Sequence, residues 1–145
     1  MELLLEYAAR HPFLVGGTAV MAAFVLAYEL SRMRSGGESV GAADAVRLIN
    51  QGALLLDVRS KDEFDAGHVL DARHVPQSEL PQGLESLKKY RDKVVITVCE
   101  SGMRSGAAAR VLRGEGFSKV LNLRGGMQAW KSENLPVVRS DRKAR

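Results

Sequence analysis

The chain opens with a hydrophobic segment that lacks the separate polar and apolar faces of a helix on a soluble protein. Residues 11–28 form 18 consecutive positions without a formal charge. As a helix they would be about 27 Å long, at about 1.5 Å per residue, which is close to the thickness of a bilayer core. The pattern predicts a transmembrane helix over about residues 11–31, within an N-terminal segment of residues 1–31.

Two alternatives for this segment remain open. A cleaved signal peptide normally has basic residues ahead of its apolar run, whereas Glu2 and Glu6 occupy that place here. A buried helix of a soluble protein is the other alternative, although this segment is apolar on every face. Arg32 and Arg34 follow the segment, and this bias indicates that the C-terminal side faces the cytoplasm.

The rest of the chain alternates between helix and strand patterns. Residues 32–40, with their glycines and serines, predict a linker. Helix patterns cover residues 42–50, 61–66, 84–90, 104–113 and 125–130. Apolar and β-branched runs predict strands over residues 53–58, 72–75, 94–98 and 119–123. Strands that alternate with helices predict an α/β domain over residues 41–138, with a small parallel sheet and helices on both of its faces.

Composition narrows the possible functions only slightly. The 145 residues include 21 Lys and Arg and 17 Asp and Glu, and the resulting net charge of +4 is too small to indicate nucleic-acid binding. Part of the charge lies in a basic tail over residues 139–145. Cys99 is the single cysteine, which excludes an internal disulfide framework and zinc sites of the Cys₄ or Cys₂His₂ type.

Cys99 is the strongest candidate for chemistry. It follows the most β-branched strand and precedes a helix, so it lies at the carboxyl edge of the predicted sheet, where such folds bind ligands. Free N–H groups at the helix start favour a thiolate, and Arg104 adds a positive charge. Gly102 allows the loop to curl so that its amides point inward. This arrangement favours nucleophilic chemistry, with a buried structural cysteine as the alternative.

Three separated motifs resemble those of the rhodanese (sulfurtransferase) family. The loop CESGMRS matches the family's Cys-x-x-Gly-x-Arg-Ser, LDVRSKDEFDAGHV resembles its Asp-Val-Arg…Glu-Phe…Gly-His segment, and LRGGMQAW resembles its Gly-Gly…Trp segment. The resemblance covers about residues 39–138, and with the N-terminal helix the chain looks like a membrane-anchored, single-domain bacterial rhodanese. Its matching residues are Asp57, Arg59, Glu63, Phe64, Gly67, His68, Cys99, Gly102, Arg104, Ser105, Gly125, Gly126 and Trp130.

The resemblance implies a sulfur-transfer reaction. Cys99 would take a sulfane sulfur from thiosulfate or a protein persulfide, hold it as a persulfide, and pass it to a thiol or similar acceptor. The resemblance implies neither a metal nor an organic cofactor. The protein would lie in the inner (cytoplasmic) membrane with its domain facing the cytoplasm, and a membrane protein could be its partner. The loop that would surround the persulfide consists of Glu100, Ser101, Gly102, Met103, Arg104 and Ser105.

Some residues depart from the family pattern or have an alternative role. Asp57 and Arg59 end a strand at the same edge of the sheet and could pair with each other or brace the loop, with a structural ion pair and a catalytic role as the alternatives. Glu100 stands where many thiosulfate-using members have a basic residue, so we expect its charge to weaken thiosulfate use. Asp71 stands where a glycine is usual, in a predicted turn.

Two other functions compete with sulfur transfer. Phosphatases and arsenate reductases of related fold place five residues between Cys and Arg, whereas only four separate Cys99 from Arg104 here. A membrane-tethered interaction module without catalysis is the rival from a different class, because many rhodanese folds only bind partners. Such modules have often lost the cysteine, which this chain retains.

Overall fold

The structure is a computed structural model that describes residues 9–35 and 38–140. The chain divides into two compact units, residues 1–36 and residues 37–145, which are described separately.

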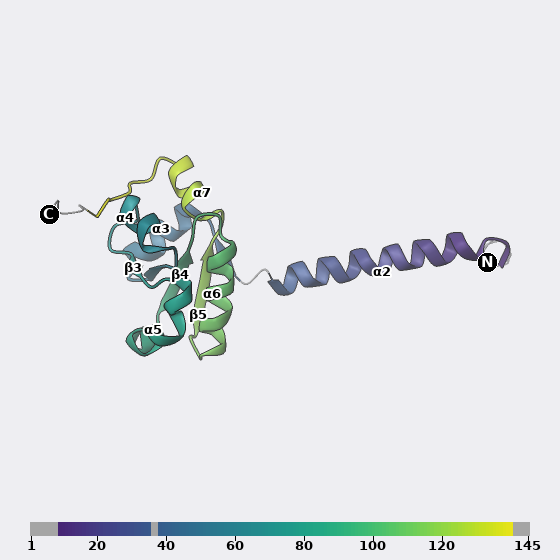
Figure 1. The fold of residues 1–145 in the computed structure, drawn as a ribbon, viewed down its shortest axis with the longest axis horizontal. Coiled ribbons are helices and arrows are strands. Elements are labelled where there is room, and N and C mark those ends of the chain that lie inside the picture. Colours follow the sequence, from purple (N-terminus) through teal and green to yellow (C-terminus); the bar gives the residue numbers. More distant parts are fainter. Residues whose placement is uncertain (1–8, 36–37, 141–145) are drawn as a thin grey trace. The chain divides into compact units, whose positions relative to one another are not determined.

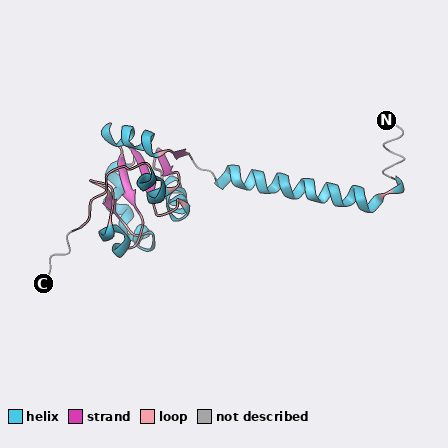
Figure 2. Cartoon of the chain, turned by 90° about the horizontal axis from the view of Figure 1, so that it is seen from above, coloured by secondary structure: helices cyan, strands magenta, loops and turns pink. Residues whose placement is uncertain are grey.

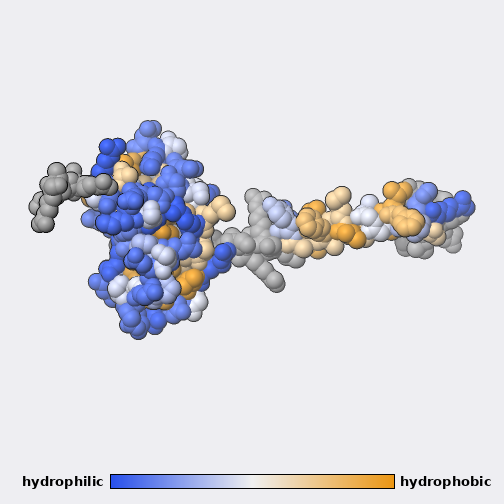
Figure 3. Space-filling view, in the orientation of Figure 1, coloured by the Kyte–Doolittle hydropathy of each residue, from blue (hydrophilic) through white to orange (hydrophobic). Residues whose placement is uncertain are grey.

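The N-terminal unit contains one long helix, α2 (Pro12–Ser35) (Figure 1). Its apolar stretch Pro12–Glu29 is entirely unburied, and in the described part of the chain it is the one stretch long and apolar enough to cross a membrane. Apolar residues gather along this helix, whereas the visible face of the C-terminal domain is mostly hydrophilic (Figure 3).

The C-terminal unit is built on a five-stranded sheet in which every strand pair is parallel, as the sequence predicts. Spatially, the strands follow the order β1-β5-β4-β2-β3. Because all strands are parallel, their carboxyl ends meet at one edge of the sheet. The strands are β1 (Ser39–Val40), β2 (Leu54–Asp57), β3 (Arg73–His74), β4 (Val94–Val98) and β5 (Lys119–Leu123).

Helices cover both faces of this sheet, as predicted (Figure 2). Successive strand residues point to opposite faces and so enter two separate cores. Leu55, Ile96 and Leu121 pack with α3 (Ala42–Asn50) and α7 (Gly126–Ser132). The next or preceding residues, Leu56, Val95 and Val120, pack with α5 (Leu80–Leu87) and α6 (Met103–Gly114). The remaining elements are α4 (Lys61–Ala66) and the 3₁₀ turns η1 (Gln77–Glu79) and η2 (Lys88–Tyr90).

Several predicted bounds lie one or two residues from those of the structure, and two differences change an element. The predicted linker extends to residue 40, but Ser39 and Val40 form β1 against Asn122 and Leu123 of β5. A strand of two residues is too short to show a periodic pattern. Helix α5 begins at Leu80, before the predicted residue 84, because a proline is tolerated in the first turn and Leu80 is buried.

Asp71 adopts a left-handed backbone conformation, with φ at +60°. The turn closes through a hydrogen bond from the Ala72 N–H to the Val69 carbonyl at 3.1 Å. Aspartate tolerates this conformation better than most residues, so it fits this turn at the position where the resemblance expects a glycine.

Candidate active site

Cys99 lies where the sequence predicts, directly after β4 and at the carboxyl edge of the sheet. Its side chain is fully buried and belongs to the core on the α5–α6 face. The strand positions it because Val98 before it is anchored in the opposite core. The thiol therefore lies at the start of the loop, where Val98 packs in the core on one face of the sheet and Cys99 in the core on the other.

Uncharged groups donate hydrogen bonds to the sulfur. The Gly102 N–H lies 3.0 Å from Cys99 Sγ, and the Ser105 hydroxyl lies 3.2 Å from it. Burial acts to raise the pKa of the thiol, but the Ser105 hydroxyl and the backbone N–H groups of Ser105, Gly102 and Ser101 outweigh it, so the pKa falls below its ordinary value. These donors therefore shift the thiol toward its thiolate form.

Gly102 shapes this loop. Its φ of +99° is in the left-handed region, and a Cβ there would lie 3.4 Å from the Leu123 carbonyl oxygen, so glycine suits the position. The Asn122 side chain, from the end of β5, donates through Nδ2 to the Gly102 carbonyl at 2.9 Å. Thr97 Oγ1 donates to the Ser105 carbonyl at 3.0 Å. Side chains of two strands therefore hold both ends of the curled segment.

The start of α7 holds the first part of the loop. The Met127 N–H donates to the Cys99 carbonyl at 2.8 Å, and the Gln128 N–H donates to the Glu100 carbonyl at 3.1 Å. Gly126 makes this close approach feasible, because a Cβ at this position would overlap the Cys99 carbonyl oxygen. The second glycine of the Gly-Gly motif is thus explained by contact with the cysteine loop.

Arg104 forms a two-pronged ion pair with Glu63 of α4, with N–O distances of 2.7 and 2.8 Å. Glu63 also completes a capping box with Ser60 at the start of α4. The hydrogen bonds from Arg104 lower the pKa of Glu63 to about 2, against the opposing effect of burial, and Glu63 raises the pKa of Arg104. The positive charge expected to serve the thiolate is therefore hydrogen-bonded to a carboxylate, while the charge of Cys99 also contributes to the raised pKa of Arg104.

Asp57 and Arg59 form a buried ion pair, with Arg59 Nη2 2.7 Å from Asp57 Oδ2. Arg59 also donates to the Gly67 carbonyl at 2.7 Å and to Glu100 Oε2 at 3.2 Å. Burial acts to lower the pKa of Arg59, but Asp57 and Glu100 outweigh it and raise the pKa. The buried pair thus connects to the loop through Glu100.

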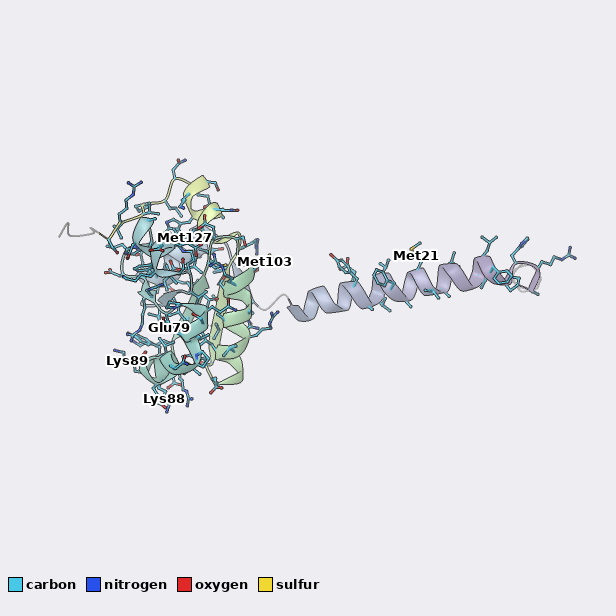
Figure 4. All side chains as sticks on the ribbon, in the orientation of Figure 1. Met21, Glu79, Lys88, Lys89, Met103 and Met127 are labelled. Atoms are coloured by element: carbon cyan, nitrogen blue, oxygen red, sulfur yellow. The ribbon has the colours of Figure 1, made fainter. Side chains whose placement is uncertain are left out.

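Glu100 is paired with two cations. Besides Arg59, Lys131 of α7 lies 3.7 Å from its Oε1. The expected repulsion between Glu100 and an anionic sulfur donor holds in full only for a carboxylate with no cation beside it. Because Arg59 and Lys131 both pair with Glu100, this repulsion is smaller. Ser101 and Met103 are exposed, and Met103 is 82% exposed at the start of α6 (Figure 4).

Four residues that contact the cysteine loop in the structure are not assigned a role in the site from the sequence. The motif match includes Glu63, but only the structure gives it a role as the partner of Arg104. Thr97 and Asn122 are polar residues at the next-to-last positions of β4 and β5, each directly after an apolar residue, a signal that marks side chains near the carboxyl edge. Lys131 has no distinguishing signal in the sequence.

Among residues 9–35 and 38–140, no group of three or more His, Cys, Asp or Glu side chains is placed to hold a metal.

The fold and the loop define a class of protein: a parallel α/β domain with a single, activated cysteine in a loop lined by amides. The sequence model of the Rhodanese-like domain matches residues 41–133, and the chain belongs to this family. The protein YibN of Escherichia coli (strain K12) is 33% identical over 141 residues, 96% of this chain and 99% of that protein.

Other relatives support the same family. A protein named sulfurtransferase from Allochromatium vinosum is 40% identical over 85 residues, 59% of this chain and 78% of that protein. The crystal structure of a rhodanese-related protein from Thermoplasma volcanium matches with a TM-score of 0.65 and 34% identity, covering 70% of this chain and 98% of that one. A tRNA uridine(34) hydroxylase of Cronobacter sakazakii also matches, with 29% identity over 70% of this chain and 32% of that protein, so similar domains also occur in proteins named for other reactions.

Proposed function

We propose that this protein is a membrane-anchored sulfurtransferase that carries a sulfane sulfur on Cys99. The observation that carries the proposal is the geometry at the sulfur, where the Gly102 N–H and the Ser105 hydroxyl both donate to Sγ. These groups stabilise a thiolate before sulfur is accepted and again when it leaves. Relatives named as sulfurtransferases support this reaction class.

The proposed reaction has two displacement steps. The Cys99 thiolate attacks the outer sulfur of the donor, the sulfur–sulfur bond of the donor breaks, and its electron pair leaves with sulfite or with the donor thiolate. The resulting persulfide is then attacked at its outer sulfur by an acceptor thiolate. The electron pair of the broken bond returns to Cys99 Sγ, where the same N–H and hydroxyl donors receive the charge.

A mass measurement tests the sulfur-carrying role and separates it from a purely binding function. The full-length protein in detergent, incubated with thiosulfate or with a glutathione persulfide, should gain about 32 Da, the mass of one sulfur atom. A reducing thiol should remove this mass, and Cys99→Ser should neither gain it nor transfer sulfur. A wild-type protein that never gains the mass would instead favour the non-catalytic interaction module.

We also propose that α2 anchors the domain in the inner (cytoplasmic) membrane with the domain in the cytoplasm. Its unburied apolar surface over Pro12–Glu29 supports anchoring, and Arg32 and Arg34 after it support the orientation. Alkaline carbonate washing should leave the protein in the membrane pellet, and release into the supernatant would contradict the anchor.

The orientation needs an accessible reporter because Cys99 is buried. Exposed Ser132 of α7 suits this purpose as Ser132→Cys in a Cys99→Ser background. An impermeant thiol reagent should label this cysteine only after spheroplasts are broken. Labelling in intact spheroplasts would place the domain on the opposite side.

A further inference from the structure

One contact at the site is used by neither step of the reaction: the Asn122 side chain against the Ser105 hydroxyl. Ser105 Oγ lies 2.6 Å from Asn122 Oδ1 and 3.2 Å from Cys99 Sγ. A hydroxyl carries a single hydrogen, so it donates to one of these two atoms at a time. Ser105 is fully buried, so water does not readily replace either partner.

The orientation of the Asn122 amide is fixed by a third group. Its Nδ2 lies 2.9 Å from the Gly102 carbonyl oxygen, which only accepts hydrogen bonds. A flipped amide would place two acceptor oxygens against each other there, so Nδ2 faces Gly102 and Oδ1 faces Ser105. The atom next to the hydroxyl is therefore an acceptor that competes with the sulfur for one hydrogen.

The competition depends on the charge of Cys99. While Cys99 is a neutral thiol, its S–H donates to Ser105 Oγ, and the hydroxyl hydrogen donates to Asn122 Oδ1. When the thiol proton passes to water, the thiolate is only an acceptor, and the hydroxyl turns to donate to Sγ. Ser105 Oγ and Asn122 Oδ1 then face each other without a hydrogen between them, which is unfavourable.

We propose that Asn122 is a positioning residue that sets the direction in which the Ser105 hydroxyl donates, and thereby opposes the charged form of Cys99. The Gly102 N–H acts in the contrary sense, since it donates to Sγ and favours the thiolate. The balance keeps the resting sulfur neutral more often than the amide donors alone would. The Ser105 hydroxyl donates to Sγ at the two stages of the proposed reaction at which Sγ is negatively charged, before sulfur is accepted and after it leaves.

The charged groups around the loop provide a constant background to this competition. The charged side chains are paired with one another, and they are Glu63 of α4, Arg104 of α6, Lys131 of α7, Glu100 of the loop and Arg59, two positions beyond β2. Substitutions at Ser105 and Asn122 leave all of these charges in place.

A double-mutant cycle separates this role from a general loosening of the loop. Because Cys99 is the single cysteine, the ultraviolet absorbance of its thiolate can be titrated in the full-length protein in detergent, with Cys99→Ser subtracted to remove the tyrosine signal. Asn122→Leu has a similar shape but no acceptor, and should lower the titration midpoint by about one pH unit, a tenfold rise in the thiolate-to-thiol ratio. Ser105→Ala should raise the midpoint, because a donor to Sγ is lost.

The decisive comparison is Asn122→Leu in the Ser105→Ala background. There the substitution should change the thiolate-to-thiol ratio by less than about twofold, because no hydroxyl remains to redirect. An equal shift in both backgrounds, or a raised midpoint in Asn122→Leu alone, would overturn the proposal by showing that loss of the Asn122–Gly102 bond is responsible. Asn122→Ala, checked by thermal melting, provides a second variant if the leucine prevents folding.

This inference uses the proposed function only in taking Cys99 as the sulfur carrier, and the two fail in different ways. A protein that gains no sulfur mass but shows the expected titration cycle would contradict the sulfur transfer and leave the role of Asn122 intact. A protein that gains the sulfur mass but does not show the expected titration differences would support sulfur transfer and contradict the role of Asn122.

Discussion

The inside and the outside of the cysteine loop are built from different interactions. Hydrogen bonds to the sulfur of Cys99 come from uncharged N–H and hydroxyl groups. The charged side chains of the same loop, Glu100 and Arg104, are engaged in ion pairs with α4, α7 and Arg59. The difference teaches that ion pairs hold the outer side of this loop, whereas neutral groups make the hydrogen bonds to its sulfur. Four predictions test how these interactions hold the loop.

The largest effect is expected at the buried pair behind the loop. Arg59→Met leaves the Asp57 carboxylate buried without its cation and should destabilise the domain by about 3–5 kcal/mol. Adding Asp57→Asn should recover part of this loss, because it removes the uncompensated charge. Urea unfolding measures both. The matched control is Arg47→Met at the exposed Arg47–Asp44 pair, where we expect less than about 1 kcal/mol.

The contact between α7 and the loop is expected to come next. Gly126→Ala places a Cβ against the Cys99 carbonyl at a positive φ, so α7 must move and weaken its hydrogen bonds to the loop. We expect a loss of about 2–3 kcal/mol, seen as a lower melting temperature together with less persulfide formation. Gly114→Ala is the control, since no atom lies within 4 Å of its added Cβ. Equal melting temperatures for the two variants would contradict the close packing.

The Arg104–Glu63 pair should give a smaller and pH-dependent effect. The pKa of Glu63 is lowered to about 2, below its ordinary value of 4.5, so its contribution is fully present above pH 4.5 and is lost as pH falls toward 2. Because both side chains are partly exposed, we expect only about 1 kcal/mol. In Glu63→Gln this part of the acid slope should disappear, while the amide still caps α4. A slope unchanged between pH 4.5 and 2 would contradict the pairing, and Glu85→Gln at an exposed pair provides the control.

The smallest effect is expected for Glu100. Because Arg59 and Lys131 already oppose its charge, Glu100→Gln should change kcat/KM for thiosulfate by less than about threefold, equivalent to about 0.6 kcal/mol. A rise of tenfold or more, strongest at low salt, would show that the carboxylate acts on the donor despite its partners. Steady-state rates at two salt concentrations distinguish these outcomes.

Local patterns in the sequence predict some elements to the residue. Strands β4 and β5 match because their β-branched and apolar runs end sharply at polar loops. The start of α5 is missed because Pro81 and Gly83 are typical of turns, and only burial of Leu80 shows that the helix includes them.

The site divides in the same way. The position of Cys99 and the curl at Gly102 follow from order along the chain. The partner of Arg104 does not, because Glu63 lies 41 positions earlier and meets it only when α4 and α6 are brought together. Asn122 is visible as a polar residue in an apolar strand, but its competition for a hydrogen depends on distances that differ by fractions of an ångström.

The presence of one buried cysteine also determines how the protein responds to oxidants. A sulfenic acid formed on Cys99 has no second thiol in the chain with which to condense, so repair requires a thiol from outside. Full burial of the side chain limits such damage by restricting the access of bulk oxidants. In the proposed reaction, the same burial means that any molecule delivering or removing sulfur must first enter the loop. Repair and the proposed turnover would then both depend on access to Cys99.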